Sequence, residues 1–294
     1  MNPTKIEWTD YSSNPIYATV DGKRGWFCEK VSPGCAHCYS STMNEGRFGN
    51  GLEFLPSNRE RVEFVLNDKE LAEWQKPKYR GKRVFAFDMT DLFGEWVSDE
   101  WLDKCFTAMA LASGVTFQIL TKRPERMREY LTTGALCRRW VTVEGQAQKF
   151  LVESGRMPYE QAVNVSVKLP LPNVWLGVTV ENQRWADERI PILLDTPAAV
   201  RFVSAEPLLG PVDLNAPWPG TVHSRDFAAQ LDWIIVGGES GPKHRPFNPD
   251  WARGVVSQCK DAGVACFVKQ LGGLRPGNKL EDLPEDLRVR EFPL

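Results

Sequence analysis

Three cysteines lie within eleven residues near the start of the chain, at a spacing that suits metal chemistry. Cys28, Cys35 and Cys38 follow the pattern C-x6-C-x2-C, and the turn sequence Ser-Pro-Gly at residues 32–34 separates the first from the second. A structural zinc site normally has four protein ligands, whereas this stretch offers one Cys-x-x-Cys pair and one outlying cysteine. Three thiolates suit an iron–sulfur cluster that keeps one iron open for a small molecule.

The sequence around these cysteines resembles a known family. TKIEWTD at residues 4–10, the NP that follows it and KVSPGCAHCY at residues 30–39 resemble an uncharacterised phage-associated three-cysteine family, which is regarded as similar to the radical S-adenosylmethionine (SAM) enzymes. The usual radical-SAM spacing is C-x3-C-x2-C, and this chain departs from it with six residues in the first gap. The resemblance implies a 4Fe-4S cluster on the three cysteines, with SAM as the second cofactor.

The implied activity is reductive cleavage of SAM to a 5′-deoxyadenosyl radical, which abstracts hydrogen from a substrate. The implied partners are an electron donor for the cluster and a nucleotide, or a modified base in DNA, as substrate. His37 lies where radical-SAM proteins usually place an aromatic residue that packs on the adenine. The same resemblance marks Gly237-Gly238-Glu239, which is similar to the motif that receives the methionine amino group but follows the sixth predicted strand instead of the second.

Other interpretations of the three thiols stay open. The chain could be a non-catalytic zinc-stabilised or redox-sensing binding protein, with His37 or a distant side chain as the fourth zinc ligand. It could also be a barrel enzyme of different chemistry whose thiols hold only a structural metal. A disulfide framework is the weakest interpretation, because seven cysteines in 294 residues do not make a short, cysteine-dense chain. Cys105, Cys137, Cys259 and Cys266 are not expected to bind metal.

Length and charge bound the remaining possibilities. A chain of 294 residues that is 42% hydrophobic can bury a full core and form one barrel-type domain over residues 1–294. Its 36 Lys and Arg and 38 Asp and Glu give a net charge of −2, so no global charge favours nucleic acid or membranes, although a local patch remains open. No apolar run approaches the ~20 residues of a membrane helix, and the N-terminus lacks the apolar core of a signal peptide. These features predict a cytoplasmic protein that does not enter membranes.

From residue 84 onward, short β-rich runs alternate with helical segments. Strands are predicted at residues 84–91, 115–124, 174–182, 199–207, 231–240 and 263–273, with KIEW at 5–8 as a possible first strand. Helices are predicted at residues 39–46, 98–113, 124–131 and from 248 onward, and residues 9–27 are predicted to form a turn-rich loop. Continuous apolar strands separated by helices indicate a parallel sheet that is covered on both faces. We therefore predict an α/β fold, a full or partial (β/α) barrel of about six to seven parallel strands. Residues 132–172 interrupt it as an insertion, which is either a lid or a structural elaboration.

Polar residues follow six of the predicted strands, where the site of a β/α barrel is expected. These residues are Asp88, Thr90, Asp91, Thr121, Lys122, Arg123, Thr179, Glu181, Ser204, Glu206, Gly237, Gly238, Glu239, Ser240, Lys269 and Gln270. SAM binding needs carboxylates for its amino group and ribose hydroxyls, and a basic group for its carboxylate. Glu206 and Asp88 are the candidates for the first role, and Lys122 or Arg123 for the second.

The predicted SAM-binding residues are His37, Asp88, Thr90, Asp91, Lys122, Arg123, Glu206, Gly237, Gly238 and Glu239. Glu206 could instead cap a turn or pair with Lys269 or Arg201. His244 and Arg245 lie on a proline-bounded loop that suits a substrate contact.

Overall fold

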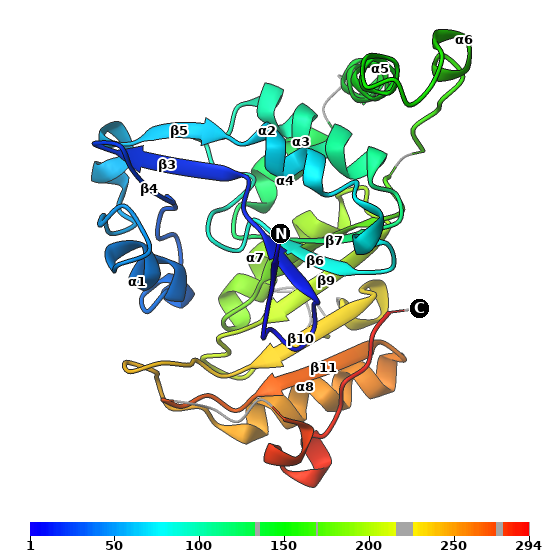
Figure 1. The fold of residues 1–294 in the computed structure, drawn as a ribbon. Helices are drawn as coiled ribbons and strands as arrows, with labels where there is room; N and C mark the ends of the chain where they lie inside the picture. Colours follow the sequence, from blue (N-terminus) through cyan, green and yellow to red (C-terminus); the bar gives the residue numbers. More distant parts are fainter. Residues whose placement is uncertain (133–135, 169, 216–225, 275–278, 294) are drawn as a thin grey trace.

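A curled, mostly parallel sheet forms the body of the protein, and its curvature makes a half-barrel (Figure 1). The computed structural model describes residues 1–132, 136–168, 170–215, 226–274 and 279–293, without the side chains of residues 136–140. The sheet has eight strands in the order β1-β2-β6-β7-β8-β9-β10-β11. Their bounds are β1 Asn2–Pro3, β2 Tyr11–Ser13, β6 Arg83–Ala86, β7 Thr116–Thr121, β8 Val174–Thr179, β9 Val200–Ala205, β10 Trp233–Gly237 and β11 Ala265–Gln270.

Strand direction agrees with the predicted fold class. Within this eight-stranded sheet, β2 and β6 to β11 pair in parallel with their neighbours, whereas β1 runs antiparallel to β2. The eight strands exceed the six to seven that were predicted, and the arrangement is consistent with a partial β/α barrel. All six strands predicted from residue 84 onward are present.

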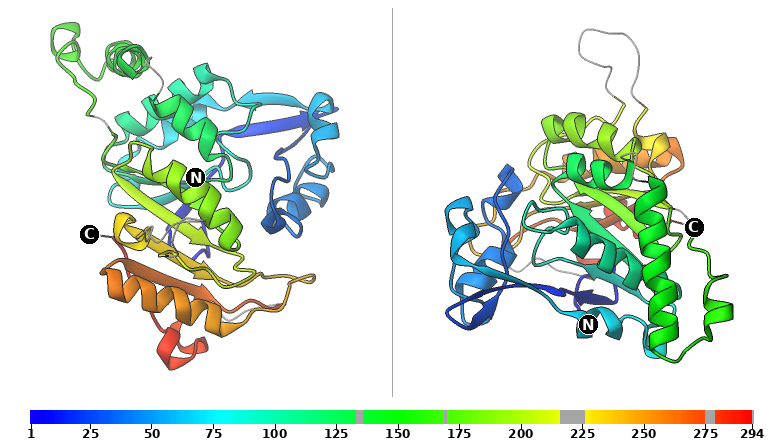
Figure 2. Two further views of the ribbon diagram at one scale, coloured as in Figure 1. Left: turned by 180° about the vertical axis from the view of Figure 1, so that it is seen from behind. Right: turned by 90° about the horizontal axis from the view of Figure 1, so that it is seen from above.

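Four helices connect consecutive strands and pack on one face of the sheet (Figures 1 and 2). They are α3 (Asp99–Leu111), α4 (Pro124–Thr132), α7 (Gln183–Leu194) and α8 (Pro249–Ala262). Ser98, Asn182 and Asn248 cap α3, α7 and α8 by accepting a backbone N–H with their side chains. The predicted helices at 98–113, 124–131 and from 248 are therefore confirmed. Cys105 of α3 and Cys259 of α8 point into the core and are buried.

The opposite, concave face of the sheet is filled by aromatic side chains. Trp8 lies 4.7 Å from Phe85 and 6.0 Å from Trp233 between ring centroids, and Phe292 lies 5.4 Å from Trp233. The predicted strand at residues 5–8 is wrong, because Trp8 inserts into this cluster from a turn and only 2% of it is exposed. Residues Tyr11–Ser13 take the sheet position beside β6 instead.

A second, three-stranded sheet is formed by residues between β2 and β6. It has the order β4-β3-β5, with β3 at Ile16–Val20, β4 at Lys23–Gly25 and β5 at Glu63–Leu66. The loop predicted at residues 9–27 is therefore wrong. Asp21 and Gly22 both have positive φ, 49° and 76°, as a two-residue hairpin turn between β3 and β4 requires.

The remaining helices do not form a single group (Figure 1). They are α1 (Tyr39–Glu45), α2 (Asp68–Glu73), α5 (Leu136–Glu153) and α6 (Tyr159–Ala162). The helix predicted at 39–46 is thus confirmed as α1. Helix α5 packs against α3, and α5 and α6 project from the body on the side away from α1 (Figures 1 and 2). Cys137 lies in α5, and its side chain is outside the described residues.

Short 3-10 helices complete the described structure. They are η1 Pro33–Cys35, η2 Pro56–Arg61, η3 Pro77–Tyr79, η4 Ala228–Gln230, η5 Leu280–Asp282 and η6 Glu285–Leu287. Within the described ranges, no helix combines the length and the apolar character that crossing a membrane requires.

Candidate functional site

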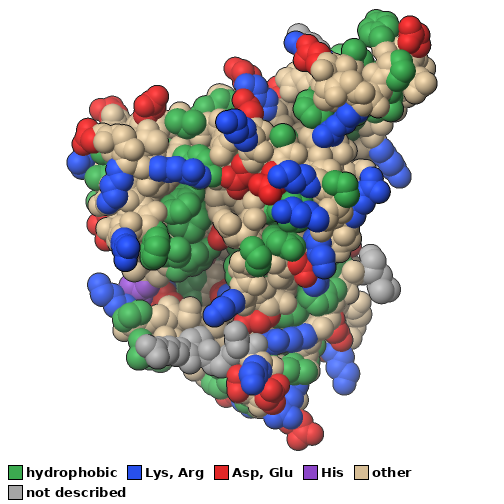
Figure 3. Space-filling model, viewed as in Figure 1, with side chains coloured by type: hydrophobic (Ala, Val, Ile, Leu, Met, Phe, Trp, Pro, Cys, Tyr) green, Lys and Arg blue, Asp and Glu red, His purple; other side chains and the backbone are tan. Residues whose placement is uncertain are grey.

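A cavity of about 240 Å³ opens at the carboxyl ends of the parallel strands. Its walls come from the strand ends β6 to β11 and from residues 27–40, which we call the cysteine loop. Figure 3 shows hydrophobic side chains gathered in the hollow between α1 and the sheet. Cys28, Cys35 and Cys38 all line this cavity, so the fold brings the three thiols to one place. The Ser-Pro-Gly turn that separates the first two forms the start of η1, where the Cys35 N–H donates to the Ser32 carbonyl at 2.9 Å.

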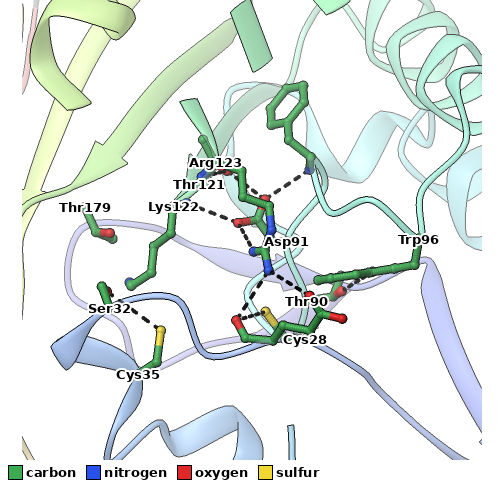
Figure 4. A network of polar contacts seen from close by, with 12 residues as sticks. Cys28, Ser32, Cys35, Thr90, Asp91, Trp96, Thr121, Lys122, Arg123 and Thr179 are labelled. Carbon is green, nitrogen blue, oxygen red and sulfur yellow. Dashed lines mark hydrogen bonds and ion pairs between the residues drawn. The ribbon is translucent and has the colours of Figure 1, made fainter. Parts of the chain in front are cut away.

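The backbone on both sides of Cys28 is held by strand-end side chains (Figure 4). Thr90, just after β6, donates its hydroxyl to the carbonyl of Phe27 at 2.6 Å. Arg123, just after β7, donates from its guanidinium to the carbonyl of Glu29 at 3.4 Å. The loop is therefore fixed at the residue before Cys28 and at the residue after it.

A buried carboxylate holds the segment that leads to Cys35. Ser32 donates its hydroxyl to Oε1 of Glu181 at 2.6 Å, and Glu181 follows β8 with no exposed surface. Arg189 of α7 donates to Oε2 of the same carboxylate at 3.2 Å, and Nζ of Lys122 lies 3.6 Å from Oε1. Gly34 is required at its position, because a Cβ there would lie 2.6 Å from Oε1 of Glu181.

The residues on both sides of Cys38 are held in the same way. Nδ1 of His37 lies 3.1 Å from Oε2 of Glu239, which follows β10. On the other side, Ser40 donates its hydroxyl to the carbonyl of Asp88 at 2.9 Å, and Tyr39 donates to the same carbonyl at 3.0 Å. Asp88 follows β6, so the three cysteines are positioned from the ends of β6, β7, β8 and β10 together.

The surroundings of Cys28 disfavour its ionised form. Burial, together with Asp91, Cys38 and Cys35, raises the pKa of the Cys28 thiol to about 12, while Arg123 opposes them. An uncompensated thiolate at Cys28 would therefore be costly, and a bound cationic metal or cluster would stabilise it. Among the described residues, no three His, Cys, Asp or Glu side chains surround one point as the ligands of a single ion do. The thiolates of a cluster bind different irons, so they need not converge on one point.

Asp91 and Glu239 already have internal partners. Asp91 accepts hydrogen bonds from the Thr121 hydroxyl at 2.7 Å, the Lys122 N–H at 3.1 Å and the Arg123 guanidinium at 3.0 Å. Arg245 binds both oxygens of Glu239, at 2.9 Å and 2.6 Å. Burial alone would raise the pKa of Glu239, but Arg245 and His37 lower it to about 2. Asp91 therefore connects the ends of β6 and β7, and Glu239 connects the end of β10 to His37 of the cysteine loop.

Arg123 and Asp88 also interact with other side chains of the protein. Burial alone would lower the pKa of Arg123, but Asp91 and Cys28 raise it, and its guanidinium lies 4.8 Å from the ring of Trp96. Asp88 accepts from the Asn14 amide at 2.6 Å and from the Tyr39 hydroxyl at 3.1 Å. Burial raises the pKa of the Asp88 carboxyl.

Glu206 lies in the cavity wall beside Lys269. Oε1 of Glu206 accepts from Nζ of Lys269 at 2.5 Å and from the Gln270 amide at 3.4 Å. The alternative pairing with Lys269 is thus present, while Oε2 has no hydrogen bond to the described residues. Gly237 lies close to this side chain, because a Cβ there would lie 3.2 Å from the Glu206 carboxyl carbon.

The structure places nearly all predicted site residues at one cavity. The cavity is lined by His37, Asp88, Thr90, Asp91, Lys122, Arg123, Glu206, Gly238 and Glu239, together with the three cysteines, whereas Gly237 is not part of its lining. Gly238 approaches protein backbone: a Cβ there would lie 2.6 Å from the carbonyl of Leu271. The predicted substrate contacts of His244 and Arg245 stay predictions: Arg245 binds Glu239 and is partly exposed, and His244 is exposed.

The contacts of Ser32, Tyr39, Ser40, Glu181 and Arg189 were not predicted. Only Glu181 had a sequence signal, its place directly after a strand. The hydroxyls and Arg189 had none, because their partners lie far away in the chain.

Comparison with known proteins places the chain in one family. The family described as "Protein of unknown function (DUF5131)" has a model that matches residues 3–286. No curated protein and no solved structure matches the chain. Because the family model spans nearly the whole chain, this protein belongs to the family described as "Protein of unknown function (DUF5131)".

Proposed function

We propose that this protein is an iron–sulfur enzyme of the radical-SAM type. The observation that carries the proposal is the position of Cys28, Cys35 and Cys38 at one cavity, each beside a residue that a strand end holds in place. A cavity at the carboxyl ends of a parallel half-barrel is where such folds place their chemistry. Three ligands from one loop, with a cavity beside them, suit a cluster whose open iron faces a small molecule.

The residues present fit the proposed cofactors. Cys28, Cys35 and Cys38 would hold a 4Fe-4S cluster, and Lys122 and Arg123 supply positive charge beside three thiolates, with side chains 19% and 12% exposed. When bound, the cluster and SAM would supply one-electron chemistry that cleaves SAM to a 5′-deoxyadenosyl radical.

The chain itself would bind and orient the cofactors and exclude water from them. Its anchors at Thr90, Glu181 and Glu239 fix the cysteine loop before any cofactor arrives. Trp8 and Phe85 line the cavity and present apolar surface to it, which limits access of water to a reactive species. Glu206 is our candidate for the SAM ribose, because its Oε2 is unbonded among the described residues and a carboxylate accepts from both hydroxyls of a diol.

Metal analysis tests this proposal. After anaerobic purification, the wild-type protein should be brown, absorb near ~400 nm and contain iron and sulfide. The triple variant in which Cys28, Cys35 and Cys38 become Ala should lose all three signals. The matched control replaces Cys105, Cys259 and Cys266, which lie away from the cavity lining, and should keep iron and sulfide if it folds.

Two other results would redirect the proposal. Full iron retention in the triple cysteine variant would remove the central claim. Stoichiometric zinc without sulfide would support the zinc-stabilised binding protein instead. With the cluster intact, reduction in the presence of SAM should release 5′-deoxyadenosine and methionine, measured by liquid chromatography.

A further inference from the structure

Helix α1, which follows Cys38, is packed with its polarity reversed. Its buried residues are Ser40, Ser41 and Asn44, whereas Tyr39 and Met43 are 50% and 43% exposed. The buried side is a hydrogen-bond network: Asn44 donates to the Asn50 side chain and to the Leu52 carbonyl, each at 2.8 Å. A surface helix normally buries its apolar stripe, so a reversed one indicates that the apolar face has another partner.

Further apolar side chains extend this exposed face. Val31 of the cysteine loop is 39% exposed, and Phe48, just after α1, is 74% exposed. The loop with Phe48 folds back onto the helix, because the Gly51 N–H donates to the Asn44 carbonyl at 2.8 Å. Tyr39 also lines the cavity. Tyr39 and Met43 lie one turn apart on the exposed side of α1, and the exposed Val31 and Phe48 flank this helix in the chain. We call these four residues the α1 surface.

Positive charge gathers around the same surface. Residues 23–48 and 239–248 together contain six Lys or Arg and three Glu, a formal charge of +3 in a chain whose net charge is −2. The second segment lies against the cysteine loop, because Glu239 binds both His37 and Arg245. Of these cations, Arg245 and Lys30 are paired with Glu239 and Glu53, whereas Arg47 and Lys243 have no ion pair with any described residue. Figure 3 shows Lys and Arg side chains on the rim of the hollow.

We propose that the α1 surface binds single-stranded nucleic acid and delivers one base to the cavity. This inference rests on the proposed function and names its substrate class. A single strand combines an anionic backbone with flat apolar rings, and grooves that bind it combine cations with exposed aromatic side chains. Phe48 and Tyr39 would stack bases, while Arg47 and Lys243 would contact phosphates.

The cavity itself favours a nucleobase over an acidic protein segment. Beyond Tyr39, its lining includes the aromatic residues Trp8, Phe85 and Phe87. Lys122 and Lys269 also line it, paired with Glu181 and Glu206. Enzymes that act on a base must take it out of its stack into such a pocket. The cations at the rim would bind an acidic protein segment as well as a nucleic acid. The aromatic side chains at the rim and in the cavity, however, suit the stacking of a nucleobase and not an acidic segment.

Binding to a labelled oligonucleotide tests the proposal. Fluorescence anisotropy of single-stranded DNA and RNA of about 12 nucleotides is measured with the full-length protein. Phe48→Ala should weaken binding by about fivefold or more, the loss of one stacked base. Arg47→Gln should reduce the slope of log K against log salt by about 0.7, the loss of one phosphate contact. The controls Tyr159→Ala and Lys149→Gln change exposed residues of α6 and α5 on the far side, and both should bind as wild type.

Several results would overturn the inference. Absence of wild-type binding at low salt would do so, and so would full affinity in Phe48→Ala. Poly-glutamate that competes as well as the oligonucleotide at equal charge would indicate an acidic protein partner instead. Iron and sulfide are measured on the same samples: oligonucleotide binding without a cluster would remove the proposed function, whereas a cluster without oligonucleotide binding would remove only this inference.

Discussion

The Ser32 hydroxyl donates a 2.6 Å hydrogen bond to Oε1 of Glu181, across 149 positions of sequence. This contact joins the cysteine loop to the end of β8 through a carboxylate that is fully buried. Arg189, with 2% of its side chain exposed, holds the other oxygen of the same carboxylate. A hydroxyl on a short turn is thus connected through one acid to a helix on the outer face of the sheet.

We predict that Glu181→Gln destabilises the protein strongly. Gln accepts from Ser32 but cannot neutralise Arg189, and leaving one buried charge unpaired costs about 3 to 5 kcal/mol. The free energy of unfolding, measured with urea, should fall by that amount. The matched control is Glu188→Gln on α7, the helix that carries Arg189. This variant breaks an exposed pair with Arg184 and should change stability by less than about 1 kcal/mol. Equal losses in the two variants would contradict this account of Glu181.

We predict that Gly34→Ala displaces the cysteine loop. The new Cβ would lie 2.6 Å from Oε1 and 2.8 Å from Cγ of Glu181, which Arg189 prevents from moving away. Overpacking of this kind costs about 1 to 3 kcal/mol and should lower iron content as well as stability. Gly254→Ala in α8 is the control, since nothing lies within 4 Å of its Cβ position. If Gly34→Ala keeps the wild-type stability and iron content, the Glu181 side chain can move aside without cost and the prediction is wrong.

Local patterns predicted the barrel strands well and failed near the N-terminus for physical reasons. The residues of β8 and β10 are apolar on both faces of the strand, which is the pattern of a buried parallel strand. KIEW, by contrast, is half charged, and its Trp8 fills the concave face of the sheet instead of pairing in a strand. The β3–β4 hairpin was missed although Asp21-Gly22 marked its turn, because its short strands are partly polar.

The candidate site was predicted in its location but not in its contacts. Strand-end position alone brought Asp88, Glu206 and Glu239 to the cavity, as the topology of a half-barrel requires. Which donor each carboxylate binds depends on loops that meet only in three dimensions. His37 and Glu239, for example, are 202 positions apart in sequence. The sequence therefore suggested carboxylates that are free to bind a ligand, whereas in the structure some of them, such as Glu239, bind other residues of the protein.

We predict a loss of stability in acid that depends on Glu239. Its pKa in the folded protein is about 2, below its ordinary value of 4.5, because Arg245 and His37 bind the ionised carboxylate more strongly than burial penalises it. A lowered pKa gives stability that is complete above pH 4.5 and is lost as the pH falls from about 4.5 toward about 2. Glu239→Gln should remove about 2 kcal/mol at neutral pH and flatten the profile across this window. Urea unfolding at several pH values measures both, and parallel profiles for the variant and the wild type would contradict the prediction.

We predict that Glu206→Gln weakens SAM binding while the cluster stays intact. A ribose diol donates two hydrogen bonds, and a carboxylate accepts both, whereas an amide offers one acceptor oxygen and an idle donor. Glu206 keeps Oε2 without a bond to any described residue, while Arg245 occupies both oxygens of Glu239 and four residues donate to Asp91. Calorimetric titration of the reconstituted variant should show a loss of about 1 to 3 kcal/mol.

The pairing of Glu206 with Lys269 makes a second variant necessary as the control for this prediction. Lys269→Met removes the 2.5 Å ion pair and leaves the carboxylate, so it separates loss of the pair from loss of the acceptor. If Glu206 binds the ribose, Lys269→Met should retain SAM binding better than Glu206→Gln, because its carboxylate still accepts from the diol. Unchanged SAM affinity and unchanged 5′-deoxyadenosine release in Glu206→Gln would move the ribose contact to Asp88, whose side chain also lines the cavity.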